Sequence, residues 1–190
     1  MSSPSIIVIV IAVTVFSFVP SIALAADGAA CTHIRTSERS IAGLIRKGQA
    51  ESPLLERLID RINSSDVIVY LRTERELPSH VDGQLTFMGA GGNHRYVVVA
   101  LAFPRAEVRT IAVLGHELRH ALEVADHPEI VDLQTFTRAY QRFGFKGVGT
   151  WRGPTFDTQA AIEAGNRVGV EVSRRIGTVA EAATMLETRP

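Results

Sequence analysis

Residues 108–126, VRTIAVLGHELRHALEVAD, decide the fold of this chain, because they predict one long amphipathic helix. Their apolar residues recur every three or four positions, the period of an α-helix, and form one stripe that should face a core. The members of the stripe are Val108, Ile111, Leu114, Gly115, Leu118, Leu122 and Ala125. The helix should end at His127, because a residue that precedes a proline is disfavoured in the α conformation.

The segments before this helix predict a pair of helices and a small sheet. Residues 37–63 place apolar side chains at helical intervals, with an expected interruption at Ser52-Pro53. Three short runs rich in apolar, β-branched and aromatic residues predict strands at residues 67–71, 84–88 and 96–103. The second and third strands should be joined by the glycine-rich loop 89–93.

The segments after the helix predict two more helices, at residues 129–143 and 156–176. Helices, a small and mostly antiparallel sheet, and then the long central helix with C-terminal helices indicate the α+β class. The length of 190 residues fits one such domain, and we expect it to comprise residues 26–190.

Residues 1–25 predict a secretory signal peptide. Residues 6–26 are apolar and uncharged, contain the helix-breaking Pro20, and carry the small-x-small cleavage pattern Ala-Leu-Ala at residues 23–25. Because the apolar run is long enough to span a bilayer, a retained membrane anchor is the alternative. Both interpretations predict a protein that works outside the cytoplasm, either secreted or periplasmic in the cell envelope.

Charge and cysteine content argue against nucleic-acid binding, binding to anionic membranes and stabilisation by an internal disulfide. The chain has 20 basic and 20 acidic side chains and a formal net charge of zero, so no footprint for nucleic acid or an anionic membrane is visible. Cys31 is the only cysteine. An exported chain of this kind cannot form an internal disulfide and must be stabilised by its core.

The central helix carries the pattern H-E-x-x-H at residues 116–120. Residues four apart lie on the same helix face, so His116 and His120 can offer two imidazole nitrogens to one metal ion. In enzymes with this pattern the glutamate, here Glu117, acts as general base on a zinc-bound water and passes its proton to the leaving amine. We therefore expect a Zn²⁺ site with two histidine ligands and a catalytic glutamate.

This arrangement resembles the zincin metallopeptidases, and the order of a sheet, the motif helix and further helices is similar to the minimal gluzincin type. The resemblance covers about residues 96–172. It implies zinc-dependent hydrolysis of a peptide or protein substrate, and it implies that strand 96–103 is the sheet edge that pairs with extended substrate. A non-catalytic binding or structural module with a zincin-like fold is the alternative interpretation.

The third zinc ligand has several candidates on the motif helix itself. Glu123 shares the histidine face, but three ligands along one straight helix span about 10 Å at about 1.5 Å per residue, which strains a shared ion. Asp126 has the spacing that metzincins use, yet those proteins need a glycine where this chain has Glu123. Glu123 has a natural second role as the carboxylate that orients a ligating histidine.

The candidate that we favour lies further along the chain. Asp157 precedes a run of small residues, and this segment resembles the gluzincin helix that supplies an acidic third ligand. Small residues such as Ala160 and Gly165 should let that helix approach the histidine helix closely. As an alternative, Asp157 caps the N-terminus of its own helix, and Glu163 remains a further candidate ligand.

Six other residues were weighed for chemical roles. Three of them can stabilise the oxyanion of a tetrahedral intermediate, although core packing or helix termination explains them equally well: Tyr96, His127 and Tyr140. Three histidines fall in predicted loops, and we assign them no metal role: His33, His80 and His94.

Overall fold

A computed structural model describes residues 32–78, 80–102, 106–146 and 155–187. The expected signal peptide, residues 1–25, and Cys31 lie outside these residues. Within the described ranges, no helix combines the length and the apolar character needed to cross a bilayer.

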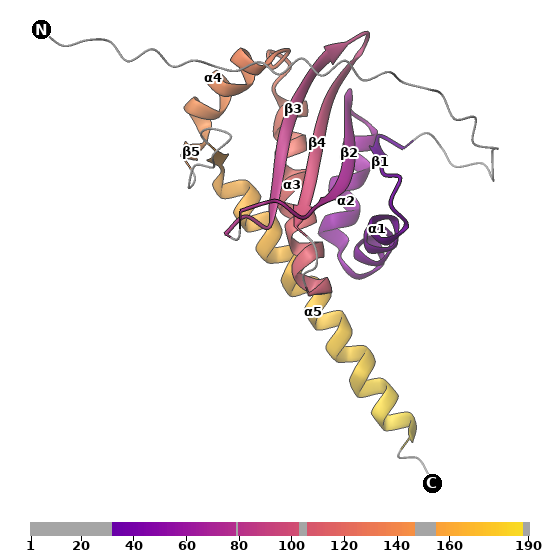
Figure 1. Ribbon diagram of the computed structural model, residues 1–190. Helices are drawn as coiled ribbons and strands as arrows, with labels where there is room; N and C mark the ends of the chain where they lie inside the picture. Colours follow the sequence, from indigo (N-terminus) through magenta and orange to yellow (C-terminus); the bar gives the residue numbers. More distant parts are fainter. Residues whose placement is uncertain (1–31, 79, 103–105, 147–154, 188–190) are drawn as a thin grey trace, which may run out of the picture. The chain divides into compact units, whose positions relative to one another are not determined.

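The protein belongs to the α+β class and contains a small mixed sheet (Figure 1). The four strands are ordered β1-β2-β4-β3 across the sheet. Their bounds are Ile34–Arg35 for β1, Val67–Glu74 for β2, Gly83–Gly91 for β3 and His94–Ala102 for β4. Strand β2 pairs in parallel with both β1 and β4, and β3 alone pairs antiparallel, with β4. Our expectation of a mostly antiparallel sheet is therefore wrong.

The apolar content of the strands explains their order. Strand β4 is buried along most of its length, and the first part of β2 is also buried, so these two strands occupy the middle of the sheet. Strand β3 is rich in glycine, buries only one of its residues fully, and takes the edge. The strand implied as the substrate-pairing edge, residues 96–103, corresponds to β4 and is internal, so this expectation is also wrong.

The β3–β4 hairpin closes more tightly than the sequence predicts. Strand β3 extends into the expected loop 89–93 as far as Gly91, and β4 begins at His94, which leaves Gly92 and Asn93 as the turn. Gly92 has φ of 59°, a left-handed conformation that glycine adopts without steric cost. The register shifts between Phe87 and Gly89, so a β-bulge at this point bends the outer strand.

Helices cover one face of the sheet. Their bounds are Arg39–Glu51 for α1, Pro53–Asn63 for α2, Glu107–Asp126 for α3, Leu133–Phe143 for α4 and Gln159–Glu187 for α5. The predicted interruption at Ser52-Pro53 is confirmed, and the Ser52 side chain caps α2 by accepting a hydrogen bond from the Leu55 N–H. Helices α1, α2 and α3 contact the sheet, while α5 packs along α3 (Figure 1).

Helix α3 forms the centre of the core, as its apolar stripe predicts. The stripe residues Ile111, Leu114, Leu118 and Leu122 are at most 1% exposed. The end of α3 is fixed by the buried Arg95 of β4, which donates hydrogen bonds to the carbonyl oxygens of Val124, Ala125 and His127, and which pairs with Asp66. The helix that carries the H-E-x-x-H pattern is therefore held along its length and at its C-terminus.

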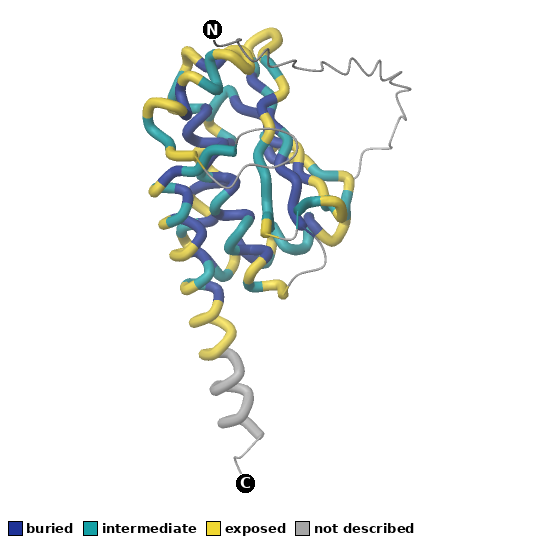
Figure 2. The backbone as a smooth tube through the Cα atoms, turned by 60° about the vertical axis from the view of Figure 1, so that its left-hand side comes forward, coloured by how far each residue is buried: buried dark blue, intermediate teal, exposed yellow. Residues whose placement is uncertain are grey.

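Small residues allow α5 to approach α3 closely, which confirms the expectation drawn from the composition of that segment. A Cβ atom placed on Gly115 would lie 2.7 Å from Val168 Cγ2, and one placed on Gly165 would lie 3.0 Å from His116 Cβ. Any larger side chain at Gly115 would therefore push the helices apart. Residues 173–178 of α5 are exposed (Figure 2), so the packed part of the helix ends at Val172.

Two predicted helices start later than expected. Helix α4 begins at Leu133 because the Asp132 side chain accepts the Thr135 N–H in a capping box. Helix α5 begins at Gln159 and continues to Glu187, beyond the predicted end. Residues 156 and 157 instead form a short strand, Phe156–Asp157 (β6), which pairs antiparallel with Phe145–Lys146 (β5).

Candidate metal centre

Two histidines of α3 face the same cleft. His116 and His120 are four residues apart, and their ring centroids lie 4.8 Å from each other with the planes at 80°. The side chain of His120 is 7% exposed and that of His116 is 24% exposed. Each ring therefore reaches the cleft from a partly or fully buried position, as the helical spacing predicts.

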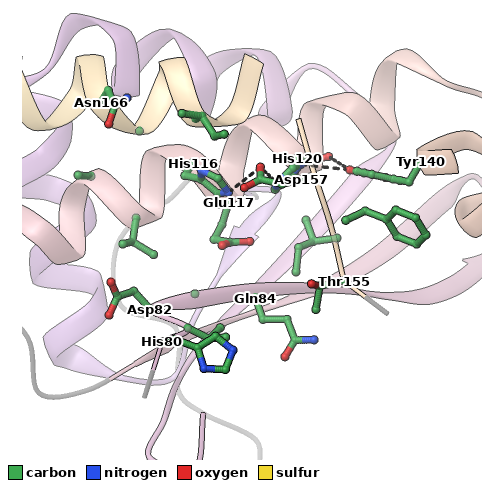
Figure 3. A pocket seen from close by; sticks show the side chains of 18 of the residues that line it. His80, Asp82, Gln84, His116, Glu117, His120, Tyr140, Thr155, Asp157 and Asn166 are labelled. Carbon is green, nitrogen blue, oxygen red and sulfur yellow. Dashed lines mark hydrogen bonds and ion pairs between the residues drawn. The ribbon is translucent and has the colours of Figure 1, made fainter. Parts of the chain in front are cut away.

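Asp157 joins the two histidines from strand β6. Its Oδ1 atom lies 3.5 Å from His116 Nε2 and 3.5 Å from His120 Nε2 (Figure 3). One ligand atom from each of the three residues lies within 4.8 Å of the others. Pairing of β6 with β5 fixes the backbone of Asp157 beside α3, although the two elements are far apart in the sequence.

The donor set and its spacing fit a zinc ion. Two imidazole nitrogens and one carboxylate oxygen form a ligand set found in catalytic zinc sites, which keep the fourth position open. Bonds of about 2.0–2.1 Å in a tetrahedron place two ligand atoms about 3.3 Å apart. The two distances of 3.5 Å are close to that value. The three ligand atoms all lie within 4.8 Å of one another, so His116, His120 and Asp157 could hold the ion once the widest pair moves closer together.

Asp157 does not cap its own helix, so this alternative interpretation is wrong. The N-cap of α5 is Thr158, whose Oγ1 atom accepts the N–H of Ala161 at 3.1 Å. The Asp157 carboxylate accepts the N–H of Thr158 through Oδ1, the atom that also faces the histidines. This hydrogen bond orients the carboxylate toward the cleft.

Glu123 supports the histidine pair. Its Oε2 atom lies 2.7 Å from Nδ1 of His120, the ring nitrogen that faces away from Asp157. Its other oxygen accepts the hydroxyl of Thr158 at 2.6 Å. This position matches the second role considered for Glu123, the orientation of a ligating histidine.

The remaining candidate ligands are placed elsewhere. Asp126 lies at the end of α3, where Arg61 and Arg119 pair with its carboxylate at 2.9 Å and 3.5 Å. Glu163 is exposed on α5 and accepts a hydrogen bond from Gln159. Neither carboxylate belongs to the group formed by the two histidines and Asp157.

Glu117 points from α3 toward the edge strand β3 (Figure 3). The residue is 4% exposed, and burial raises the pKa of its carboxyl from 4.5 to about 7. The backbone N–H of Leu85 hydrogen-bonds the carboxylate. A Cβ atom on Gly83 would lie 2.7 Å from Glu117 Oε1, so the absence of a side chain at this position makes room for the carboxylate.

The charges of the ligand group are strongly coupled. Burial alone would lower the pKa of His120, but hydrogen bonds with Asp157 and Glu123 outweigh it and raise this pKa to about 9. Burial and the neighbouring His120 lower the pKa of His116. Burial opposes ionisation of Asp157, yet the two histidines hold its pKa below the ordinary value. Without a metal ion, His120 therefore favours its protonated form, and its positive charge offsets those of Glu123 and Asp157.

The group opens into a cleft of about 610 Å³ between α3, β3 and the start of α5. Apolar side chains line part of the cleft: Leu85, Val113, Phe136 and Ile162. Polar side chains line the rest, including Asp82, Gln84 and Asn166 (Figure 3). Arg109 also lines the cleft. A cleft of this size, with a few converging polar groups, is typical of a small-molecule or peptide site.

The other residues considered for catalysis have different surroundings. The Tyr140 hydroxyl is directed at Glu123 Oε2 and the His120 carbonyl, at 3.2 Å and 3.3 Å. His127 stacks on Phe143 and pairs with Glu129. Among the described residues that line the cleft, His80 and Tyr140 are present, whereas Tyr96, His33, His94 and His127 are not.

The sequence did not indicate two groups that contact the residues of the candidate metal centre, the side chain of Thr158 and the backbone N–H of Leu85. Thr158 has no periodic or motif signal, although its position directly after a candidate ligand could have drawn attention to it. The backbone N–H of Leu85 carries no sequence signal.

No protein-family model, curated protein or solved structure matches this chain. Its function must therefore be inferred from the geometry of the site.

Proposed function

We propose that this protein is a zinc-dependent peptidase with a zincin-like arrangement. One observation carries the proposal: His116, His120 and Asp157 converge within 4.8 Å at the wall of a cleft that also contains the buried Glu117. Two histidines, a carboxylate and a neighbouring glutamate are the parts that metal-assisted hydrolysis requires.

In this proposal the zinc ligands and Glu117 would have different roles in hydrolysis. A zinc ion, when bound, lowers the pKa of a coordinated water to about 7 and polarises a carbonyl group. Glu117 would accept a proton from the attacking water and donate it to the leaving amine. Its pKa of about 7 without metal suits a group that must both accept and donate a proton near neutral pH.

The edge strand β3 would hold the substrate. The Ala102 N–H donates to the Asp82 carbonyl oxygen, so alternate residues of β3, starting at Asp82, point their backbone groups at β4. The backbone groups of Gly83 and Leu85 therefore point outward, toward α3 and the cleft, where Glu117 accepts the Leu85 N–H and the other groups face the cleft. An extended peptide could add to this edge as a further strand, with its scissile bond near the zinc site.

A non-catalytic binding module is the competing function, because the same metal group could serve to stabilise a fold. The absence of side-chain bulk at Gly83 and the cleft beside Glu117 favour catalysis, since a purely structural zinc site has four protein ligands and no open position.

We also propose that the N-terminal signal directs the protein to the cell exterior or the periplasm.

The decisive experiment compares hydrolysis of an unstructured protein, such as casein, by wild type, Glu117→Gln and Glu163→Gln. Wild type should cleave casein when loaded with zinc and lose this activity after chelation. Glu117→Gln should bind zinc yet cleave at least about 100-fold more slowly, as expected for loss of a general base. The exposed Glu163→Gln control should behave as wild type, and equal activity of all three proteins would contradict the proposal.

A further inference from the structure

Glu123 lies at the centre of a buried network that joins three elements. The residue is 5% exposed and receives hydrogen bonds from α3, α4 and the start of α5. His120 and Tyr140 approach Oε2 at 2.7 Å and 3.2 Å, and Thr158 donates to Oε1 at 2.6 Å. Each carboxylate oxygen therefore has at least one partner, which keeps a buried charge tolerable.

This network determines which nitrogen of His120 can bind a metal. A carboxylate accepts hydrogen bonds and does not donate them, so Glu123 requires a proton on Nδ1 of His120. A neutral ring with its proton on Nδ1 presents the lone pair of Nε2, which faces Asp157. The orientation of Glu123 therefore controls the metal-binding tautomer of His120.

Thr158 connects this control to the third ligand. Its hydroxyl donates to Glu123 and accepts the N–H of Ala161, so both hydrogen-bonding functions are engaged and the side chain is 4% exposed. Its backbone N–H donates to Oδ1 of Asp157 at 2.7 Å. One residue thus contacts the carboxylate that orients His120 and the carboxylate that would bind the ion.

We propose that Thr158 is a positioning residue of the metal centre, which sets zinc affinity by holding Glu123 and Asp157 in one arrangement. This inference rests on the proposed zinc site. The Thr158 hydroxyl fixes the distance between the Glu123 carboxylate and the first turn of α5. Asp157, the preceding residue, is thereby held at the distance from His120 that a shared ion requires.

The test is a competition titration that measures the zinc dissociation constant of wild type, Thr158→Val, Thr158→Ser and Thr110→Val. Valine keeps the shape of threonine but leaves Glu123 Oε1 without its donor, so we expect affinity to fall about 10- to 100-fold. Serine retains the hydroxyl and should restore affinity to within about 3-fold of wild type. The absorption spectrum of the cobalt-substituted protein should change in the valine variant and not in the serine variant.

Thr110→Val is the matched control. Thr110 is also a buried threonine of α3, and its hydroxyl donates to the carbonyl of Ala106, the N-cap of the same helix. Its replacement removes a buried hydroxyl without touching Glu123 or Asp157, so zinc affinity should stay at the wild-type value. Equal zinc affinity in Thr158→Val and Thr110→Val would show that Thr158 acts only on stability and would overturn the inference.

A double-mutant cycle with Glu123→Gln separates the cap of α5 from the contact with Glu123. If Thr158 acts through Glu123, the double variant should bind zinc no more weakly than the weaker single variant. Additive losses of affinity would contradict this route. Failure of the proposed function has a different signature, because wild type would then bind no zinc at all.

Discussion

Helix α3 carries two buried glutamates in opposite electrostatic states. Glu117 is 4% exposed and Glu123 is 5% exposed, so burial of the two side chains is nearly equal. Burial raises the pKa of Glu117 to about 7. Burial acts on Glu123 in the same direction, but hydrogen bonds from His120 and Thr158 hold its pKa below 4.5. The hydrogen bonds and the charge of His120 outweigh burial at Glu123, whereas burial dominates at Glu117.

The two sides of α3 therefore differ in what they can do. The side that faces β3 keeps a carboxylate that can exchange a proton near neutral pH. The side that faces α4 and β6 keeps a fixed negative charge that orients His120. A site that must both hold a metal ion and move a proton needs these two kinds of carboxylate.

The largest effect should appear in the stability of the metal-free protein. The pKa of Glu117 is higher in the folded protein than the ordinary value of 4.5, so its contribution to stability is present below pH 4.5 and is lost as pH rises through 7. Glu117→Gln should therefore stabilise the metal-free protein at pH 8 by on the order of 3 kcal/mol. Urea unfolding of both proteins at pH 5 and pH 8 measures this difference.

Glu123→Gln should have the opposite effect on stability at pH 8, since it removes a charge that is stabilised by its partners. If both substitutions shift the free energy of unfolding in the same direction at pH 8, the contrast between the two carboxylates is wrong.

The second effect concerns zinc affinity. Glu123→Gln weakens the hold on His120 and should lower zinc affinity about 10- to 100-fold, as is usual for a carboxylate that orients a ligating histidine. Glu117→Gln should change affinity by less than about 3-fold, because its carboxylate does not belong to the ligand group. Isothermal titration of zinc into both variants tests the difference. A greater loss in Glu117→Gln would reverse our assignment of the two roles.

The smallest effect should come from the backbone of β3. Leu85→Pro removes the N–H that contacts Glu117 and leaves the hydrogen bonds between β3 and β4 in place, because proline is tolerated at outward-facing positions of edge strands. We expect zinc affinity to be unchanged and peptide hydrolysis to fall about 10-fold, which corresponds to one lost hydrogen bond. Circular dichroism should confirm an intact fold, and wild-type activity would argue against a catalytic role for the hydrogen bond between Leu85 and Glu117.

The fold could be predicted in part. The period of the apolar residues was sufficient to locate α3 and the break between α1 and α2, because helical packing is encoded locally. The direction of the strands could not be predicted from local pattern. Strand β4 comes third among the segments considered, yet it lies between β2 and β3, and this placement depends on which strands are apolar enough to be buried.

The candidate site could also be predicted only where its residues are close together in the sequence. His116, Glu117 and His120 were found because they share one helix and a known spacing. Asp157 was favoured through resemblance and stands beside the histidines, but its position in a strand was not foreseen. The role of Thr158 depends on contacts between α3 and α5 that only the three-dimensional structure brings together. The periodicity of one sequence does not predict contacts between residues that are far apart along the chain.

The central claim is that His116, His120 and Asp157 bind one zinc ion. The most direct measurement is the zinc content of purified protein, by mass spectrometry of metals after dialysis, for wild type and Asp157→Ala. The account predicts about one zinc per wild-type chain and nearly none in Asp157→Ala, since a zinc site with two protein ligands is weak. A wild-type protein without zinc, or an Asp157→Ala variant that retains a full equivalent, would contradict it.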